Sequence, residues 1–386
     1  MKKIILSMMA ACAMFFATSC ENSDVTFDNY DYQTVYFATQ YPVRTITLGE
    51  DAAYPNEDDN QHKFQIKATL GGDRNLKSEH KIKIVVDNSL CDSLKYSNGQ
   101  AVQPMPAEYY QLASDIITIP AGQIVGGVEV KLTDAYFADP KSLDVTYVVP
   151  IRMVEVAGND SILSGTKKET VESPVLQNAA DWNVAPQNYV LYAVKYKNPY
   201  HGCWISHGTD EIDLDGTTTT VQREAEYLEK NELRYLRSLS LNKCSYGLST
   251  VVNITDKKNE ATTATLNASL ILNIADDGSV TITSEDNNQY DVPGSGNGGK
   301  YSFTASGTGK WTSLGAKKAW ADQDRDLFEL QYTVTYTYTD KGVTHVKKYT
   351  CKDNLVMQSR ENNYETFEVT YNKIIKNINH EQENIL

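Results

Sequence analysis

Four aromatic side chains carry the clearest potential for ligand chemistry in this 386-residue sequence. Tyr200 and Trp204 lie close together where one strand-like segment gives way to the next, and Trp311 and Trp320 flank Gly315 in a second predicted loop. Sugar rings stack their CH faces on flat aromatic surfaces and bond to nearby amides and acids. We therefore take these four aromatic residues as candidate glycan-binding residues. Packing in an apolar core is the alternative for each of them.

Carboxylates are numerous, but they do not define a catalytic pair. Hydrolysis of a glycosidic bond needs two acids placed at a set separation, and an acidic chain offers many such pairs by chance. The acidic string DEIDLDG at 210–216 ends in a segment, Asp213–Gly216, that we interpret as a turn. No Ser-His-Asp set can be assigned from residue order alone. The sequence thus predicts no catalytic residues and a protein that is not an enzyme.

An alternating acidic string, DQDRD, contains Asp322, Asp324 and Asp326. Three acids two positions apart could hold calcium. The intervening Arg325 and the lack of the glycine and glutamate that complete a calcium loop favour a polar loop before the long strand that follows. We predict no metal there, with calcium as the open alternative.

Two other patterns suggest cofactors only weakly. His201 and His207 lie six positions apart, which permits a metal site, but a surface strand accounts for both. The glycine-rich segment 293–299 (PGSGNGG) is not followed by a helix, which a phosphate-binding loop requires. We therefore predict that the protein uses no cofactor.

The N-terminus has the pattern of an export signal that ends in a lipid attachment site. Two lysines are followed by an apolar run over 4–17, which is shorter than the ~20 residues that span a bilayer. The small residues before Cys20 resemble the lipobox of bacterial lipoproteins. We predict a signal peptide over 1–19, lipid attachment at Cys20 and a lipidated tether over 20–30. The alternative is a secreted protein cut near Ser19.

Charge and composition narrow the class of partner. The formal net charge is -14, which disfavours nucleic acid and anionic membrane surfaces as ligands and suits neutral ones. Tyrosine dominates the aromatic residues, with 25 Tyr against 9 Phe and 4 Trp, and this suits both sugar contacts and β-strands. We therefore predict no interaction with nucleic acid.

The cysteines beyond the N-terminus are far apart in sequence. None of them forms a CxxC pair, and four could form disulfides in three ways. A chain of this length needs no disulfides to hold a core. We expect mostly buried free thiols at Cys91, Cys203, Cys244 and Cys351.

Short alternating strand patterns dominate the first half of the chain. About seven occur over roughly 130 residues without a strong helical period, which is typical of an immunoglobulin-like β-sandwich. The clearest lie at 34–38, 43–48, 64–70, 81–86, 116–119, 128–132 and 147–153. We predict this sandwich over 31–165.

A second, larger antiparallel domain is predicted after a linker over 166–187. Its longest strands are expected at 189–196, 264–274 and 327–338, joined by tight turns such as Asp276-Asp277-Gly278. The whole protein is therefore predicted to be all-β. The domain over 188–372 could close as a lipocalin-like β-barrel or fold as a β-sandwich. A flexible tail is expected over 373–386.

Specific strings resemble a group of Bacteroides surface lipoproteins over nearly the whole exported chain. In the first half the matching strings are 35–38, 44–49, 105–110, 119–122, 132–134 and 160–165. These resemble the N-terminal domain of unknown function of proteins encoded beside starch-utilisation-type outer-membrane glycan importers. In the second half the strings 189–202, Trp320 with 324–326, and 353–356 resemble the domain often paired with it.

The resemblance implies a glycan-binding or accessory protein of a polysaccharide utilisation system at the cell surface. It names no sugar and no binding residues. Our leading hypothesis is a non-catalytic outer-membrane lipoprotein that binds glycan in its C-terminal domain, with the N-terminal sandwich as a spacer. The expected partners are a glycan, the outer-membrane importer complex and the membrane, through the lipid anchor. The alternatives are a structural importer subunit without sugar binding and a glycoside hydrolase.

Overall fold

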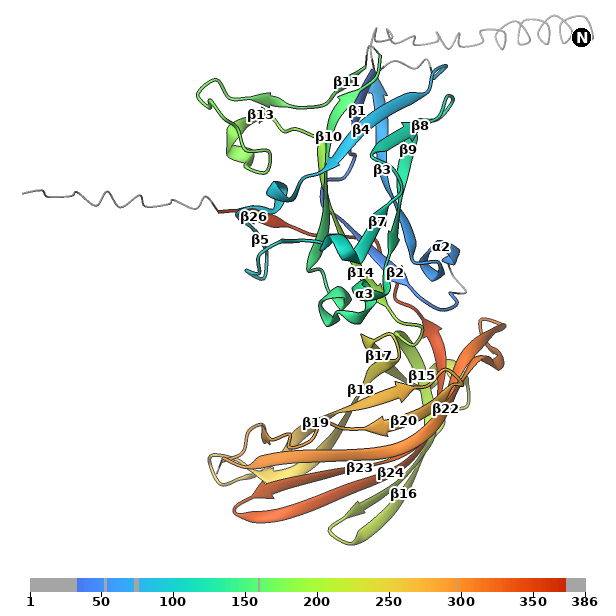
Figure 1. Ribbon diagram of the computed structural model, residues 1–386. Coiled ribbons are helices and arrows are strands. Elements are labelled where there is room, and N and C mark those ends of the chain that lie inside the picture. Colours follow the sequence, from blue (N-terminus) through green and yellow to red (C-terminus); the bar gives the residue numbers. More distant parts are fainter. Residues whose placement is uncertain (1–32, 52–53, 73–75, 159, 297, 373–386) are drawn as a thin grey trace, which may run out of the picture.

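The structure is a computed structural model that describes residues 33–372, apart from 52–53, 73–75, 159 and 297. The predictions for the signal peptide at 1–19, the tether at 20–30, Cys20 and the tail at 373–386 lie outside the described residues. The described chain forms two β domains, one above the other in Figure 1, with only short helices. This confirms the predicted all-β class.

The first domain contains short strands, most of which the alternation of apolar residues predicted. They are β1 (Gln33–Tyr36), β2 (Pro42–Thr47), β3 (Lys63–Gly72), β4 (His80–Val86), β5 (Leu94–Tyr96), β6 (Gln103–Pro104), β7 (Tyr110–Leu112), β8 (Ile116–Ile119), β9 (Val125–Leu132), β10 (Tyr147–Val156), β11 (Ser161–Ile162) and β14 (Tyr189–Lys197). Its α-helices are α2 (Glu57–Asn60) and α3 (Asp134–Ala138). Its 3₁₀ turns are η1 (Asn88–Cys91), η2 (Ala107–Tyr109) and η3 (Pro140–Leu143).

These strands form a sandwich around a main apolar core. One layer contains β11, β1, β3, β9 and β7, and the other contains β8, β4, β10, β14 and β2. The layers are joined at a single pair, Thr118 with Gly127, between β8 and β9. Phe64 and Ile66 of β3 face the same core as Ile82 and Ile84 of β4. The period-two alternation of strands such as β3 and β4 therefore places their apolar faces between the layers.

The structure corrects the predicted domain boundary at 187/188. Strand β14 pairs with β10 and with β2, so it is a central strand of the first domain. The predicted linker 166–187 is an excursion within that domain and contains β12 (Thr166–Lys167), η4 (Ala179–Asp181) and β13 (Trp182–Val184). The boundary moves to residue 198 because both edges of β14 form hydrogen bonds within the first sheet.

The chain returns to the first domain after completing the second. Strand β25 (Glu365–Thr366) pairs with β2, and β26 (Val369–Tyr371) pairs with β5. Phe367 packs with Tyr41 and Tyr96 in a second, smaller core. The second domain is therefore an insertion between β14 and β25, and the predicted range 188–372 joins strands of both domains.

The second domain is a sheet that closes on itself. Its strands are β15 (Gly202–Leu214), β16 (Thr217–Arg223), β17 (Glu232–Ser240), β18 (Lys243–Thr255), β19 (Ala261–Ile274), β20 (Ser279–Thr283), β21 (Tyr290–Asp291), β22 (Lys300–Trp320), β23 (Gln323–Asp340) and β24 (Val343–Ser359), with the 3₁₀ turn η5 (Leu228–Lys230). Strand β15 pairs with β17 and also with β24. Of the two predicted alternatives, these pairings fit the closed antiparallel barrel. Alternate residues of each strand, such as Leu266 and Leu270, fill one continuous core.

Other sequence predictions are confirmed in the described chain. Cys91, Cys203, Cys244 and Cys351 are all free and buried.

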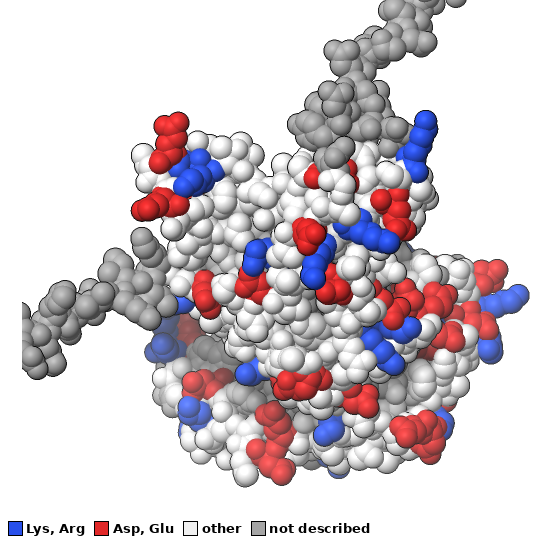
Figure 2. All heavy atoms as spheres, turned by 45° about the horizontal axis from the view of Figure 1, so that its top comes forward, with Lys and Arg blue, Asp and Glu red and all other residues white. Residues whose placement is uncertain are grey.

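On the face shown in Figure 2, acidic side chains are interspersed with basic ones. None of the described helices is long and apolar enough to cross a membrane.

Candidate binding cleft at the domain junction

Three of the four candidate aromatic residues lie in or against the core of the second domain. Trp204 is fully buried, and its Nε1 donates to the carbonyl oxygen of Tyr200 at 3.1 Å. Tyr200 is buried as well and meets the ring of Trp311 edge-on, with 5.2 Å between the centroids. Trp204 packs on Phe328 at 4.9 Å. The prediction that these residues stack sugars is corrected for Trp204 and Tyr200, because buried rings have no face to offer a ligand.

Trp320 lies elsewhere, at the tip of the β22–β23 hairpin beside the first domain. It is half-buried and lines a cleft. The tip is irregular: the pairing of β22 with β23 shifts twice after Thr312, and Leu314 adopts a positive φ of 49°. The carboxylate of Asp326 holds this bend by accepting the backbone N–H of Leu314 at 2.9 Å. Asp324 does the same for Lys318 at 3.0 Å.

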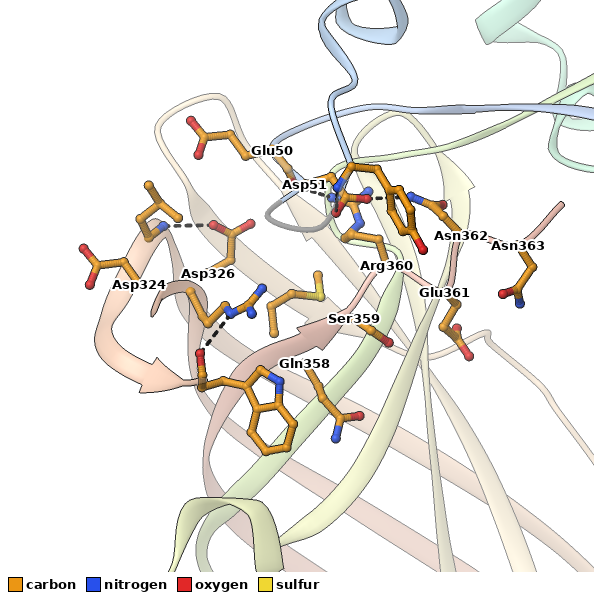
Figure 3. A pocket seen from close by; sticks show the side chains of 15 residues that line it. Glu50, Asp51, Asp324, Asp326, Gln358, Ser359, Arg360, Glu361, Asn362 and Asn363 are labelled. Carbon is orange, nitrogen blue, oxygen red and sulfur yellow. Dashed lines mark hydrogen bonds between the residues drawn. The ribbon is translucent and has the colours of Figure 1, made fainter. Parts of the chain in front are cut away.

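The cleft is a hollow of about 480 Å³ between the two domains. Three segments line it. They are Glu50, Asp51 and Tyr54 of the first domain, Leu314, Trp320 and 324–326 of the hairpin, and 357–363 at the end of β24 and beyond. Figure 3 shows Glu50 and Asp51 on one side, Asp324 and Asp326 on the hairpin, and Gln358 to Asn363 along the remaining wall.

A buried arginine fixes the inner wall of this cleft. Arg360 is only 5 % exposed, and its Nη2 donates to the carbonyl oxygens of Leu48 at 2.8 Å and Asn198 at 2.6 Å. Nη1 donates to the carbonyl oxygen of Glu50 at 3.4 Å. One guanidinium therefore links the loop after β2, the connection after β14 and the end of β24. Burial lowers the pKa of Arg360, although the charge of Asp326 opposes this.

Other polar contacts hold the outgoing chain against the first domain. Lys197 Nζ donates to the carbonyl oxygens of Arg360 and Glu361, at 3.2 and 2.7 Å. Asn362 accepts a hydrogen bond from Thr47 Oγ1 at 2.9 Å and donates from Nδ2 to Asp51 at 2.6 Å. The cleft walls are thus fixed before any ligand arrives, which lowers the entropic cost of binding.

Carboxylates outnumber guanidinium groups in the cleft lining, five to two. Two of these carboxylates, Asp324 and Glu361, are paired with Lys317 and Arg237 beside the cleft. Burial raises the pKa of Asp326, although the N–H of Leu314 and the charge of Arg360 act against this. Contacts with Lys317 and the amide of Lys318 lower the pKa of Asp324. An anionic ligand would meet repulsion here, whereas neutral hydroxyl groups would find acceptors.

The other residues considered for metal or catalysis are used differently. Among the described residues, no group of three or more His, Cys, Asp or Glu side chains could hold a metal ion. Asp324 and Asp326 each receive a backbone amide, whereas Asp322 is exposed. His201 Nδ1 accepts the N–H of Ser238 at 3.1 Å, and burial lowers the pKa of His201 to about 3.

The acidic string at 210–216 is mostly strand. Strand β15 continues to Leu214, and the turn that reverses the chain is centred on Asp215 and Gly216, both with positive φ. The predicted turn over Asp213–Gly216 is therefore confirmed for Asp215 and Gly216, whereas Asp213 and Leu214 belong to strand β15. Asp210 is buried and paired with Arg223 inside the second domain, away from the cleft.

Sequence patterns did not identify most of the residues that form the cleft. Arg360, Asn362 and Tyr54 follow or precede regular strands and belong to no motif. The only signal was an arginine with two asparagines directly after the last long strand of the second domain. These residues come to line the cleft only because the chain returns to the first domain. That return is made by β25 and β26, which are two and three residues long.

Two family models match the chain, one in each structural domain. One, described as Domain of unknown function (DUF5627), matches residues 199–361, and a model of an N-terminal domain matches residues 27–160. A search of curated proteins finds no match.

Among solved structures, this chain is similar to a Bacteroides ovatus protein of unknown function. The two are 40% identical with a TM-score of 0.73, over 89% of this chain and 100% of the other. A multidomain Bacteroides ovatus protein including DUF1735 is 12% identical, with a TM-score of 0.35 over 84% of this chain and 94% of the other. An auxiliary nutrient binding protein from Bacteroides thetaiotaomicron is 12% identical, with a TM-score of 0.33 over 82% and 90%.

Proposed function

The chain belongs to the family of the Bacteroides ovatus protein of unknown function, and we propose that it is a non-catalytic protein that binds a glycan in its interdomain cleft. The observation that carries the proposal is Trp320, a half-buried aromatic ring in a preformed polar cleft. A ring in such a position offers a sugar one apolar face, while amides and carboxylates around it can bond the hydroxyl groups.

The polar lining supports a neutral glycan. Gln358 and Asn363 supply amides, and Glu361, which is paired with Arg237, supplies a further acceptor within a few residues of them. The excess of carboxylates disfavours uronic acids and sulfated sugars, because their charges would be brought close to Glu50 and Asp51. We therefore propose neutral hexoses or pentoses as the units recognised.

Removal of the Trp320 ring tests the site. Trp320→Ala should lower the affinity for a neutral oligosaccharide at least about tenfold, which is the usual effect of losing an aromatic anchor. Isothermal titration of the purified chain, with a ligand chosen from a glycan array, measures this. The matched control is Tyr227→Ala, which removes a ring that is 56% exposed and lies outside the cleft. Equal affinities for Trp320→Ala and the wild type would refute the site, and an array without any binding would refute the function.

A glycoside hydrolase is the second candidate, and one observation favours it. Asp324 and Asp326 line one cleft with pKa shifts in opposite directions, as acid and base catalysts often do. Both carboxylates already accept backbone amides of the hairpin, which explains them as parts of its fold. If the purified protein released reducing ends from a bound glycan, and Asp326→Asn abolished this release, the proposed function would be hydrolysis and not binding alone.

The cellular setting is also a proposal and rests on the N-terminal sequence. We propose a lipoprotein of the outer membrane, exposed at the cell surface and anchored by lipid at Cys20, that acts beside an outer-membrane glycan importer. Tethering would raise the local concentration of a weak binder at the importer.

Replacement of the anchor cysteine tests this setting. In cells that express the chain, labelled fatty acid should be incorporated into the wild type and be absent from Cys20→Ala. The variant should leave the membrane fraction while its purified body keeps the same affinity for sugar. Equal labelling of both forms would contradict the anchor. Copurification with the importer that persists when no glycan binds would favour the structural-subunit alternative.

A further inference from the structure

The interdomain cleft and two further hollows adjoin one another through shared lining residues, and we refer to the three together as the groove. A second hollow of about 570 Å³ shares Tyr54, Asn362 and Asn363 with the cleft. A third, of about 480 Å³, shares Pro42, Arg44, Tyr192 and Tyr364 with the second. The groove therefore leaves the second domain and continues over the face of the first, along the segment 360–364.

An exposed tyrosine lines the second and third hollows of this groove, and its backbone is held in place on both sides. Tyr364 is 79% exposed, more than any other large apolar or aromatic residue in the described chain. On one side Asn362 is bonded to Thr47 and Asp51. On the other side Glu365 pairs with Val43 in the sheet, and its carboxylate accepts Lys195 Nζ at 2.6 Å. The ring is in solvent although the chain that carries it is held at both sides.

A second aromatic ring lies in the same part of the groove. Tyr192 is half-buried and lines both the second and the third hollow together with Tyr364. Its ring is stacked on that of Phe64, with centroids 5.4 Å apart and planes 20° from parallel. Arg44 on the groove wall is paired with the buried Asp59, so its charge is already balanced. This part of the groove thus repeats the aromatic and polar character of the cleft.

We propose that the ligand is a linear neutral glycan chain of several sugar units, which runs from Trp320 to a second stacking position at Tyr364 and Tyr192. This inference rests on the proposed function and extends it to the first domain, which then binds ligand and is not merely a spacer. Trp320 lines only the cleft, whereas Tyr364 lines only the second and third hollows. A monosaccharide held at Trp320 within the cleft would therefore leave Tyr364 without a contact.

The test is a length series. Affinities of the full chain for malto-, cello-, xylo- and manno-oligosaccharides of two to eight units are measured by isothermal titration. For the series that binds, affinity should rise at least about tenfold between two and about six units, as the second aromatic contact is reached. Tyr364→Ala should abolish this rise and leave the affinity for the two-unit ligand within about twofold of the wild type.

Two controls separate ring contact from folding. Tyr364→Phe keeps the ring and should keep the dependence on length, whereas Tyr227→Ala should change neither value. Trp320→Ala should weaken binding at every length. An affinity that is already constant at two or three units, or a long-chain affinity unchanged in Tyr364→Ala, would overturn the extended groove and leave the cleft site intact. Failure of every series to bind would overturn both proposals.

Discussion

Replacing Asp353 by Asn should lower the free energy of unfolding by about 3 kcal/mol, because it breaks a buried ion pair from one side. Asp353 is 2% exposed inside the second domain. Its carboxylate accepts the hydroxyl groups of Tyr332 at 2.6 Å and Tyr246 at 3.0 Å, and it pairs with the guanidinium of Arg223. All three partners donate to Asp353, so its carboxylate acts here as an acceptor only.

An amide satisfies this position poorly. If the NH₂ group of Asn faced Arg223, two donors would meet, and if it faced Tyr246 and Tyr332, their hydroxyl protons would lose the carboxylate oxygen that now accepts them. The charge of Arg223 would also lose one of its carboxylates. Burial alone would lower the pKa of Arg223, but Asp210 and Asp353 together raise it above its usual value. Because Asp210 still bonds Arg223 at 2.7 and 3.0 Å, we expect a loss near the lower end of the range for broken buried pairs.

Urea unfolding of the purified chain measures this effect. The matched control is Asp291→Asn, which breaks the ion pair of an 81% exposed carboxylate with Lys300 on the surface. Such pairs contribute little, so the control should lose no more than about 0.5 kcal/mol. If Asp353→Asn cost no more than the control, the buried network would be irrelevant to stability.

The strands could be predicted from the sequence because each buries one face. In β3, Phe64, Ile66, Ala68 and Leu70 are buried while Gln65 and Lys67 are exposed, and the printed sequence shows this alternation directly. The domain boundary could not be predicted in the same way. Strand β14 is buried along most of its length on both faces, and the choice of its partners depends on contacts with residues far away in sequence.

The candidate site was predictable by residue type but not by location. Trp204 and Trp320 look alike in the sequence, since each is an aromatic residue near a predicted loop. The structure buries Trp204 completely and places Trp320 on the cleft, because the tip of the β22–β23 hairpin meets the first domain. The exposure of a side chain at a domain junction depends on how the two domains dock. Strands β25 and β26, which return the chain to the first domain, are too short to be recognised from the sequence.

Arg360→Met should lower the free energy of unfolding by about 2–4 kcal/mol and weaken glycan binding as well. Methionine fills similar space but leaves the carbonyl oxygens of Leu48 and Asn198 buried without a donor, at about 1–3 kcal/mol each. Removal of a buried charge offsets part of this cost. The affinity should fall because Glu50 and Trp320, which line the cleft from different domains, lose the contact that holds the walls in place.

Two other variants test whether the guanidinium group of Arg360 causes this loss of stability. Arg325→Met is the matched control, since this cleft arginine makes only a long contact, from Nε to the carbonyl oxygen of Trp320 at 3.5 Å, and it should cost less than about 0.5 kcal/mol. Arg360→Lys keeps the charge and a donor, so it should recover part of the loss, though a lysine cannot reproduce the planar set of bonds. A methionine variant as stable as the wild type, or no better recovery with lysine, would contradict the role of the guanidinium.

The reason for expecting so large an effect lies in how the domains are joined. The two domain cores are separate clusters, and no buried apolar cluster spans the junction among the described residues. Contacts there are instead directional, from Arg360 to three backbone carbonyls and from Lys197 to two. Directional bonds fix an orientation where apolar contact would permit sliding. A cleft whose two walls belong to different domains requires that fixed orientation if it is to be formed before its ligand arrives.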